Sequence, residues 1–220
     1  MKKNKIKKVI ILGAGGNALV MESTIEDINK EKKILKLIGF LDDTTKNKSK
    51  KLLGPINEKN IKKYSNNKDI FFLWSLRSTN LKQEAYKKFL KLNIPKKKFI
   101  NIIHPTATIS KTAKLGSGIT IHPYVNIGPN TKIGNHVNIF SQSTIGHDTK
   151  LDDFAYVANN SSIGAFVEIN QGGYIGMNAT IKERVKIKKW SVVGMGSVVI
   201  KNVNAFKTVV GNPAKELKKK

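Results

Sequence analysis

A period of six residues in the second half of the chain constrains the fold more than any other feature of the sequence. From Ile103 to Val199, every sixth residue is Ile, Leu or Val, which makes 17 consecutive positions. The residue four places after each of these is small or β-branched. An α-helix cannot use this period, because six residues advance about 600° around the helix axis and the apolar stripe would drift.

Short strands joined by tight corners can use this period. Each group of six residues would form one side of a triangular coil, with the aliphatic and the small residue turned inward. Three groups make a coil, so the run predicts about 5.7 coils of parallel β-helix with ladders of Ile stacked at strand spacing. We expect the Gly or Asn that often follows the aliphatic residue to occupy a corner with unusual backbone dihedrals. No long loop interrupts the repeat.

The N-terminal part follows a different pattern, that of a βαβ unit. Val9–Leu12 is predicted to be a short buried strand, and Leu19–Asn29 is compatible with a helix. Between them, Gly-Ala-Gly-Gly-Asn-Ala at residues 13–18 matches the pattern G-x-G-x-x-[GA]. Glycines permit a tight turn there, and free N–H groups at the start of the helix can hold a phosphate.

Two further strands and a helix complete the expected unit. Leu37–Leu41 ends in Asp42 and Asp43, whose carboxylates can accept hydrogen bonds from ribose hydroxyls or a base. Residues 70–74 are predicted to be a third strand and residues 80–92 an amphipathic helix. A proline followed by three lysines then leads into the repeat.

The glycine-rich loop alone is compatible with a dinucleotide site, a nucleotide-sugar site, or merely a tight turn. A unit of three strands lacks the second half of a full NAD-binding fold, which argues against NAD. The expected fold class is therefore an α/β Rossmann-like βαβ unit at residues 1–98, followed by an all-β parallel β-helix at residues 99–220 with a short C-terminal tail.

The charge of the chain resembles that of a nucleic-acid-binding protein, with 40 basic against 15 acidic residues and a net charge of +25. Only two of the basic residues are arginine, Arg77 and Arg184, whereas base and phosphate recognition favours the bidentate guanidinium. We therefore expect no nucleic-acid partner. The lysines are interpreted as a solvated surface, with an anionic partner as the alternative.

Composition also limits the location and chemistry of the chain. No apolar run approaches the roughly 20 residues that span a bilayer, so no membrane insertion is expected. The chain has no cysteine, which excludes disulfides, thiol catalysis and cysteine-ligated metal sites. A reducing, cytoplasmic location fits this composition.

Four histidines are the remaining candidates for metal ligands or catalysis: His104, His122, His136 and His147. No two of them are closely spaced, so no metal site is expected. The first two stand one full coil apart, each before a proline, which places them at equivalent corners of successive coils. We interpret all except His147 as structural or solvent-exposed.

Several motifs occur together in one order and carry a family resemblance. They are the glycine-rich loop, Gly39-Phe-Leu-Asp42-Asp43, Ile103-His-Pro105, Gly146-His-Asp148 and Gly211-Asn-Pro-Ala-Lys215. Over essentially its full length the chain resembles the sugar O-acyltransferase family of hexapeptide-repeat acetyltransferases, which includes sialic acid O-acetyltransferases and UDP-4-amino-sugar N-acetyltransferases. The resemblance implies a left-handed β-helix that binds acetyl-CoA, an N-terminal unit that binds a nucleotide sugar, and a homotrimer with active sites between adjacent β-helices.

The resemblance also assigns roles to residues of this chain. His147 would be the general base and Asp148 the carboxylate that orients it. The backbone at Gly164 and Ala165 would stabilise the oxyanion. The implied acetyl-CoA-binding residues are Tyr156, Met177, Gly194, Met195, Gly196 and Lys215. The implied nucleotide-sugar-binding residues are Gly13, Gly15, Gly16, Asn17, Asp42 and Asp43.

Three positions depart from the family pattern. Relatives commonly have histidine at the positions of Tyr156 and Asn17, and a glycine-asparagine turn where this chain has Ser-Leu-Arg-Ser at residues 75–78. These departures leave the acetyl-transfer residues in place and bear on the identity of the acceptor.

The expected function is transfer of the acetyl group from acetyl-CoA to an amino sugar, nucleotide-linked and 4-amino, for surface glycan biosynthesis. Since no acyl-enzyme nucleophile is visible, direct attack in a ternary complex is expected. The alternatives are O-acetylation of sialic acid or a related sugar, a different acyl donor, and a non-catalytic sugar-binding scaffold.

Overall fold

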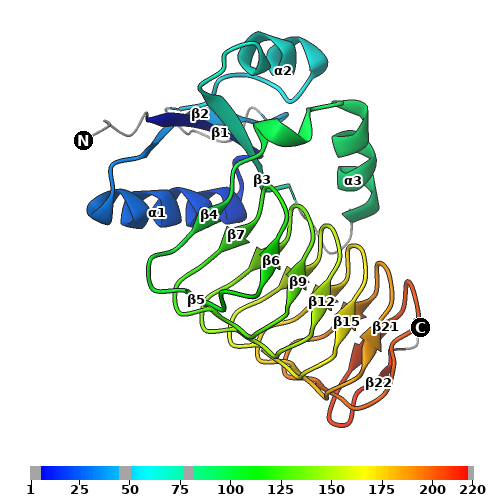
Figure 1. Ribbon diagram of the computed structural model, residues 1–220. Helices are drawn as coiled ribbons and strands as arrows, with labels where there is room; N and C mark the ends of the chain where they lie inside the picture. The colour runs from blue at the N-terminus through cyan, green and yellow to red at the C-terminus, as the bar shows by residue number, and fades with distance from the viewer. Residues whose placement is uncertain (1–5, 45–50, 77–81, 218–220) are drawn as a thin grey trace. The chain divides into compact units, whose positions relative to one another are not determined.

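The computed structural model describes residues 6–44, 51–76 and 82–217 (Figure 1). Two compact units make up the chain, residues 1–105 and 106–220. In the part of the chain that is described, no helix is long and apolar enough to cross a lipid bilayer.

The first unit is built on a small parallel sheet with strand order β2-β1-β3. Its elements are β1 (Lys7–Leu12), α1 (Gly16–Glu31), β2 (Leu35–Leu41), α2 (Glu58–Ser65), β3 (Ile70–Trp74), α3 (Lys82–Lys91), the 3-10 helix η1 (Lys96–Lys98) and β4 (Ile102–Ile103). Parallel pairing and the helices confirm the Rossmann-like βαβ unit.

The central strand of this sheet is the most buried part of the unit. Residues 9–12 are fully buried, as expected for a strand covered on both faces. Helix α1 begins at Gly16, three residues before the expected start, because the helical turn already includes the last glycine of the loop. Helix α2 was not expected from the sequence; its start is capped by Asn57, whose Oδ1 accepts a hydrogen bond from the Asn60 N–H at 2.9 Å.

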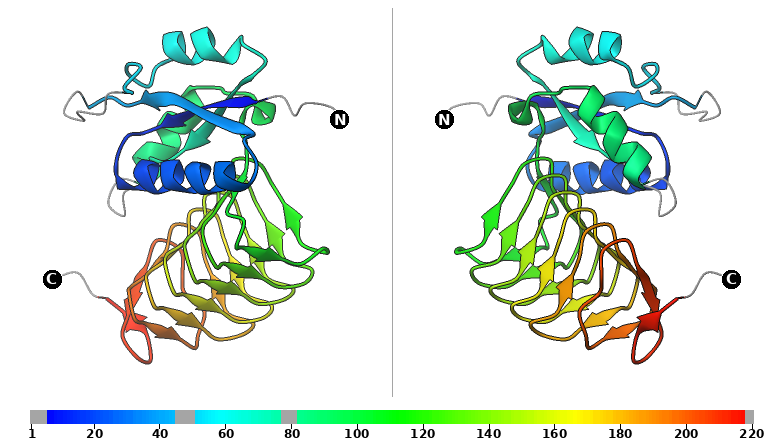
Figure 2. Two further views of the ribbon diagram at one scale, coloured as in Figure 1. Left: turned by 90° about the vertical axis from the view of Figure 1, so that its left-hand side faces the viewer. Right: turned by 90° about the vertical axis from the view of Figure 1, so that its right-hand side faces the viewer.

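The second unit is a β-helix with three faces, each a stack of short parallel strands (Figure 2). We name the faces by their outward side chains. The lysine face consists of β6 (Lys114–Leu115), β9 (Lys132–Ile133), β12 (Lys150–Leu151), β15 (Glu168–Ile169) and β18 (Lys186–Ile187). The threonine face consists of β5 (Thr108–Ile109), β8 (Asn126–Ile127), β11 (Thr144–Ile145), β14 (Ser162–Ile163), β17 (Thr180–Ile181) and β20 (Val198–Val199). The tyrosine face consists of β7 (Thr120–Ile121), β10 (Asn138–Ile139), β13 (Tyr156–Val157), β16 (Tyr174–Ile175), β19 (Val192–Val193) and β21 (Thr208–Val210).

The six-residue period corresponds to these strands. In each strand of the repeat the second residue is the periodic aliphatic one, and from Ile121 to Val199 all of these side chains are buried. Strands one coil apart pair in register, for example Ile145 with Ile163. The predicted parallel β-helix is thereby confirmed. A short antiparallel strand, β22 (Lys215–Glu216), pairs with β21 and forms the C-terminal tail.

The expected reason for the corner glycines was wrong. Gly146 and Gly164, which directly follow the aliphatic residue, do not have positive φ. They are needed because the next coil passes close to them: a Cβ at Gly146 would lie 2.7 Å from the Ala165 nitrogen. Positive φ falls two residues later and is adopted by side-chain-bearing residues such as Asp148 and Phe166.

Candidate active site

His147 and Asp148 lie at the corner that joins the threonine face to the lysine face. This corner, which we call the histidine corner, recurs once in every coil of the β-helix. In four successive coils its stacked positions are Pro129, His147, Ala165 and Glu183. Each is followed by a residue with positive φ, namely Asn130, Asp148, Phe166 and Arg184.

The histidine and the aspartate are directly hydrogen-bonded. His147 Nδ1 lies 2.7 Å from Asp148 Oδ2, and the Asn130 Nδ2 group donates to Asp148 Oδ1 at 3.2 Å. The hydrogen bond with His147, followed by the one from Asn130, holds the pKa of Asp148 below its ordinary value. Asp148 is therefore an ionised carboxylate near neutral pH.

This carboxylate determines which imidazole nitrogen is free. An ionised carboxylate can only accept, so His147 Nδ1 must carry the hydrogen of the 2.7 Å contact. In the neutral ring Nε2 is then unprotonated. Since the His147 side chain is 53% exposed, this nitrogen is available to a substrate.

One aromatic ring and one guanidinium complete the surroundings of the histidine. The rings of Phe166 and His147 meet edge to face, with 5.1 Å between centroids and an interplanar angle of 82°. Arg184 lies over the Phe166 ring at 4.4 Å from its centroid. Asp148, Phe166 and Arg184 line a cavity of about 650 Å³ on the lysine-face side of the corner.

The two proposed oxyanion positions differ in their hydrogen bonding. The Gly164 N–H donates to the Ile181 carbonyl at 2.9 Å as part of the strand ladder. The Ala165 N–H has no acceptor among the residues that the structure describes. Ala165 stands one coil beyond His147 on the histidine corner, a rise of about 4.8 Å. Of the pair, only Ala165 offers a free donor beside the base.

The residues assigned to acetyl-CoA lie elsewhere on the β-helix. Met177 and Met195 stack one coil apart at the corner between the tyrosine face and the threonine face, which we call the methionine corner. Both are exposed, and Gly194 and Gly196 flank Met195 there. Within one chain, the width of the threonine face separates this corner from His147.

Tyr156 and Lys215 occupy two further positions. Tyr156 is buried in the tyrosine face, stacked between neighbours with 5.0 Å to the Tyr174 centroid and 4.9 Å to the Phe140 centroid. Lys215 is exposed on the C-terminal strand β22. The structure therefore groups the predicted base and oxyanion residues, and it places the predicted donor-binding residues apart from them.

In the N-terminal unit, the predicted nucleotide-sugar residues surround the loop between β1 and α1. Gly13 has φ +105°, and a Cβ there would lie 2.5 Å from the Ser75 hydroxyl. A Cβ at Gly15 or Gly16 would meet open space, and α1 begins without a side-chain cap. Asn17 Nδ2 lies 3.5 Å from the Ser75 carbonyl oxygen.

The carboxylates of the two aspartates that follow β2 are hydrogen-bonded to other groups of the protein. Asp42 Oδ2 accepts from the Ala14 N–H at 2.6 Å, and Oδ1 accepts from Thr44. Burial raises the pKa of Asp42, but the hydrogen bonds from Thr44 and Ala14 outweigh it, and the pKa lies below its ordinary value. Asp43 accepts from the Ile56 N–H at 2.9 Å and forms an ion pair with Lys88. Asp42 thus ties the glycine-rich loop to the end of β2.

The other histidines have structural surroundings. His104 is buried and lies 3.2 Å from the carboxylate of Asp27 on α1. His122 and His136 are buried against Phe140 and Phe154, with centroids 4.4 and 4.9 Å apart. Over the described residues, no group of three or more His, Cys, Asp or Glu side chains is arranged to hold a metal ion.

Asn130, Phe166 and Arg184 were not identified from the sequence. The sequence does contain a signal for these three residues. Asn130, Asp148, Phe166 and Arg184 follow one another at intervals of one whole coil, that is, three groups of six residues. Reading the repeat by whole coils, instead of by groups of six, would have stacked them beside His147. Residues 75–78 are the segment where the sequence departs from the glycine-asparagine turn of the family. Two residues of this segment, Arg77 and Ser78, lie outside the described residues.

Comparison with solved structures shows the fold. The acetyltransferase domain of PglB from Neisseria gonorrhoeae FA1090, in complex with acetyl coenzyme A, is 21% identical with a TM-score of 0.82 and covers 96% of this chain and 100% of that one. A histidine-to-asparagine mutant of perosamine N-acetyltransferase from Caulobacter crescentus, in complex with CoA and GDP-perosamine, is 22% identical with a TM-score of 0.81 and covers 97% and 98%. WeeI from Acinetobacter baumannii AYE is 22% identical with a TM-score of 0.76 and covers 96% and 100%. Comparison with curated proteins gave no significant match.

Two family models match the chain. The model of the PglD N-terminal domain matches residues 8–89, and the model of the GMPPB C-terminal domain matches residues 100–220. With the solved structures, they confirm the resemblance to hexapeptide-repeat sugar acyltransferases at the level of domains and fold. Because the model of the GMPPB C-terminal domain matches more than half of the chain, the chain belongs to that family, and its N-terminal part is similar to the PglD N-terminal domain.

Proposed function

We propose that this protein is an acetyltransferase that moves the acetyl group of acetyl-CoA onto the amino group of a nucleotide-linked 4-amino sugar, for surface glycan biosynthesis. The observation that carries the proposal is the histidine corner, where an exposed imidazole is hydrogen-bonded to an ionised carboxylate beside the Ala165 N–H. The solved relatives include an N-acetyltransferase in complex with CoA and GDP-perosamine and a domain in complex with acetyl-CoA, which supports both substrates.

The proposed chemistry is a direct transfer in a ternary complex. The sugar amine attacks the thioester carbonyl while Nε2 of His147 removes the amine proton, and Asp148 stabilises the resulting imidazolium. The tetrahedral oxyanion receives a hydrogen bond from the Ala165 N–H. Its collapse breaks the C–S bond, and the proton passes to the departing CoA thiolate. The products are the N-acetylated sugar and CoA.

The separation of the histidine corner from the methionine corner supports an active site shared between chains. We propose that Met177, Met195, their flanking glycines, Tyr156 and Lys215 bind acetyl-CoA for the His147 of an adjacent chain. A homotrimer of β-helices provides three such sites. The glycine-rich loop of the N-terminal unit would hold the nucleotide, with Asn17, Asp42 and Asp43 at its edge. We place this reaction in the cytoplasm.

A thiol-release assay tests the proposal. The full-length protein is incubated with acetyl-CoA and a panel of UDP-, GDP-, dTDP- and CMP-linked sugars, in amino and hydroxyl forms. Release of CoA with an amino form is the expected result. Release with only hydroxyl forms would replace N-acetylation by O-acetylation, and the absence of both release and acetyl-CoA binding would overturn the proposed function.

A further inference from the structure

The three faces of the β-helix differ sharply in charge. On the lysine face, all five outward positions are charged: Lys114, Lys132, Lys150, Glu168 and Lys186. At the same strand position, residues 108–198 of the threonine face and 120–192 of the tyrosine face carry no charged side chain. A lysine content caused only by codon usage would populate all faces alike, so this placement calls for its own explanation.

The charges of the lysine face are balanced at one end only. Lys150 pairs with Asp152 at 2.9 Å, and Lys186 pairs with Glu168 at 2.9 Å. Lys114 and Lys132 have no carboxylate within 4.0 Å among the described residues. These two are register partners on adjacent strands, where like charges are destabilising. Strands β6, β9, β12 and β15 run one behind another along this face (Figure 1).

The unbalanced lysines lie beside the candidate catalytic corner. Lys114 and Lys132 line the cavity that also contains Asp148, Phe166 and Arg184. Arg184 is held over the Phe166 ring and, in the portion of the chain described, has no carboxylate partner. Five cationic and two anionic side chains line this cavity in all. It therefore has the electrostatics of an anion site.

We propose that this cavity contains a phosphate-binding subsite in which Lys114 and Lys132 hold the diphosphate group of a substrate. Neighbouring lysines along the ladder are about 4.8 Å apart, so one extended diphosphate can meet two ammonium groups. Lysine binds phosphate as a point charge. The inference rests on the proposed function, since nucleotide sugars and CoA both contain a diphosphate.

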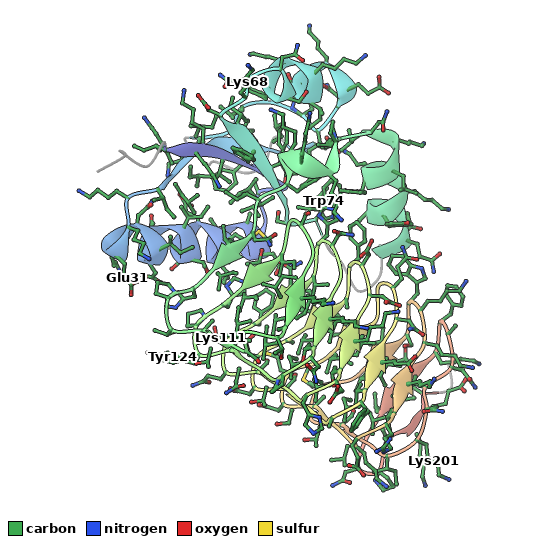
Figure 3. All side chains as sticks on the ribbon, viewed as in Figure 1. Glu31, Lys68, Trp74, Lys111, Tyr124 and Lys201 are labelled. Atoms are coloured by element: carbon green, nitrogen blue, oxygen red, sulfur yellow. The ribbon has the colours of Figure 1, made fainter. Side chains whose placement is uncertain are left out.

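Binding measurements on the full-length protein test the subsite. The variant Lys114→Gln/Lys132→Gln is compared with the wild type and with Lys201→Gln. Lys201 is an exposed lysine near the C-terminal end of the β-helix (Figure 3), and it is not among the residues that line the cavity. The probes are inorganic pyrophosphate, GDP, UDP and CoA, each titrated calorimetrically at fixed ionic strength. The melting temperature of the double variant should equal or exceed that of the wild type, because a like-charge contact has been removed.

The expected result is at least a tenfold weaker affinity of the double variant for pyrophosphate, with Lys201→Gln within twofold of the wild type. Weaker binding of GDP or UDP with unchanged CoA binding identifies the sugar nucleotide as the source of the diphosphate. Weaker CoA binding with unchanged GDP and UDP binding identifies the donor. If all four affinities of a folded double variant stay within twofold of the control, the inference is wrong.

The same experiment separates this inference from the proposed function. Acetyl transfer by the wild type, together with unchanged affinities of the double variant, would overturn the subsite alone. Absence of acetyl transfer, together with weakened pyrophosphate binding, would leave the subsite standing and remove the proposed reaction.

Discussion

At the scale of single residues, the candidate site depends on one hydrogen-bonded pair. His147 Nδ1 is directed to Asp148, so the remaining nitrogen is free to act as a base. The sequence suggested both residues through the Gly-His-Asp segment and its family resemblance. It did not indicate that Asn130 donates to the other carboxylate oxygen, because that contact joins residues one coil apart.

Asp148→Asn tests the orienting role of the carboxylate. The substitution keeps the shape but removes the charge that fixes the ring, so we expect kcat to fall roughly 10- to 100-fold. The KM for acetyl-CoA should change little, because the proposed acetyl-CoA-binding residues lie elsewhere on the β-helix. An unchanged kcat would remove Asp148 from the mechanism.

Asp42→Asn tests the anchor of the glycine-rich loop. Because hydrogen bonds hold the pKa of Asp42 below its ordinary value, the carboxylate stabilises the folded state above about pH 4 and loses that effect as the pH falls. We expect a loss of about 1–3 kcal/mol at pH 7 that shrinks below about pH 4. Melting curves across pH measure it, with the more exposed Asp43→Asn as control. A difference that stays constant with pH would contradict this account.

At the scale of elements, the repeat was predictable and the corners were not. The period of six brings the aliphatic residue of each group to the inside, and the stacked Ile ladder follows from it. The corners depend on how closely successive coils approach, which a single period does not reveal. That is why the role of Gly146 and Gly164 was assigned to dihedral freedom when the close approach of the next coil is the cause.

Gly164→Ala tests this close approach. A Cβ at Gly164 would lie 2.6 Å from the Glu183 nitrogen, so the coil must shift and we expect destabilisation of about 1–3 kcal/mol. Gly16→Ala is the matched control, because a Cβ there meets nothing within 4 Å and the residue lies in a helix. Chemical denaturation compares the two. Equal effects would show that coil spacing does not require the glycine.

At the scale of the whole molecule, the net charge could be read from the sequence but its placement could not. The regular recurrence of Lys114, Lys132 and Lys150 is present in the sequence, yet it has meaning only once three groups of six are known to make a coil. The N-terminal unit was predictable because its glycine-rich loop lies directly between a strand and a helix. The many contacts of Asp42 were not, since they depend on Thr44 and Ala14 folding around it.

The proposed sharing of the active site between chains predicts an oligomer. In moderate salt, light scattering after size exclusion should give three times the 24.4 kDa mass of the chain. A monomer at assay concentrations would contradict a site built from the histidine corner of one chain and the methionine corner of another.

The most direct test of the account is the rate of CoA release by His147→Ala, measured with the acceptor that the panel identifies. We predict that kcat falls by roughly 10²–10⁴-fold while acetyl-CoA affinity stays within about twofold, because the imidazole acts on the proton and not on the donor. A variant that releases CoA at the rate of the wild type would contradict the central claim that His147 is the base.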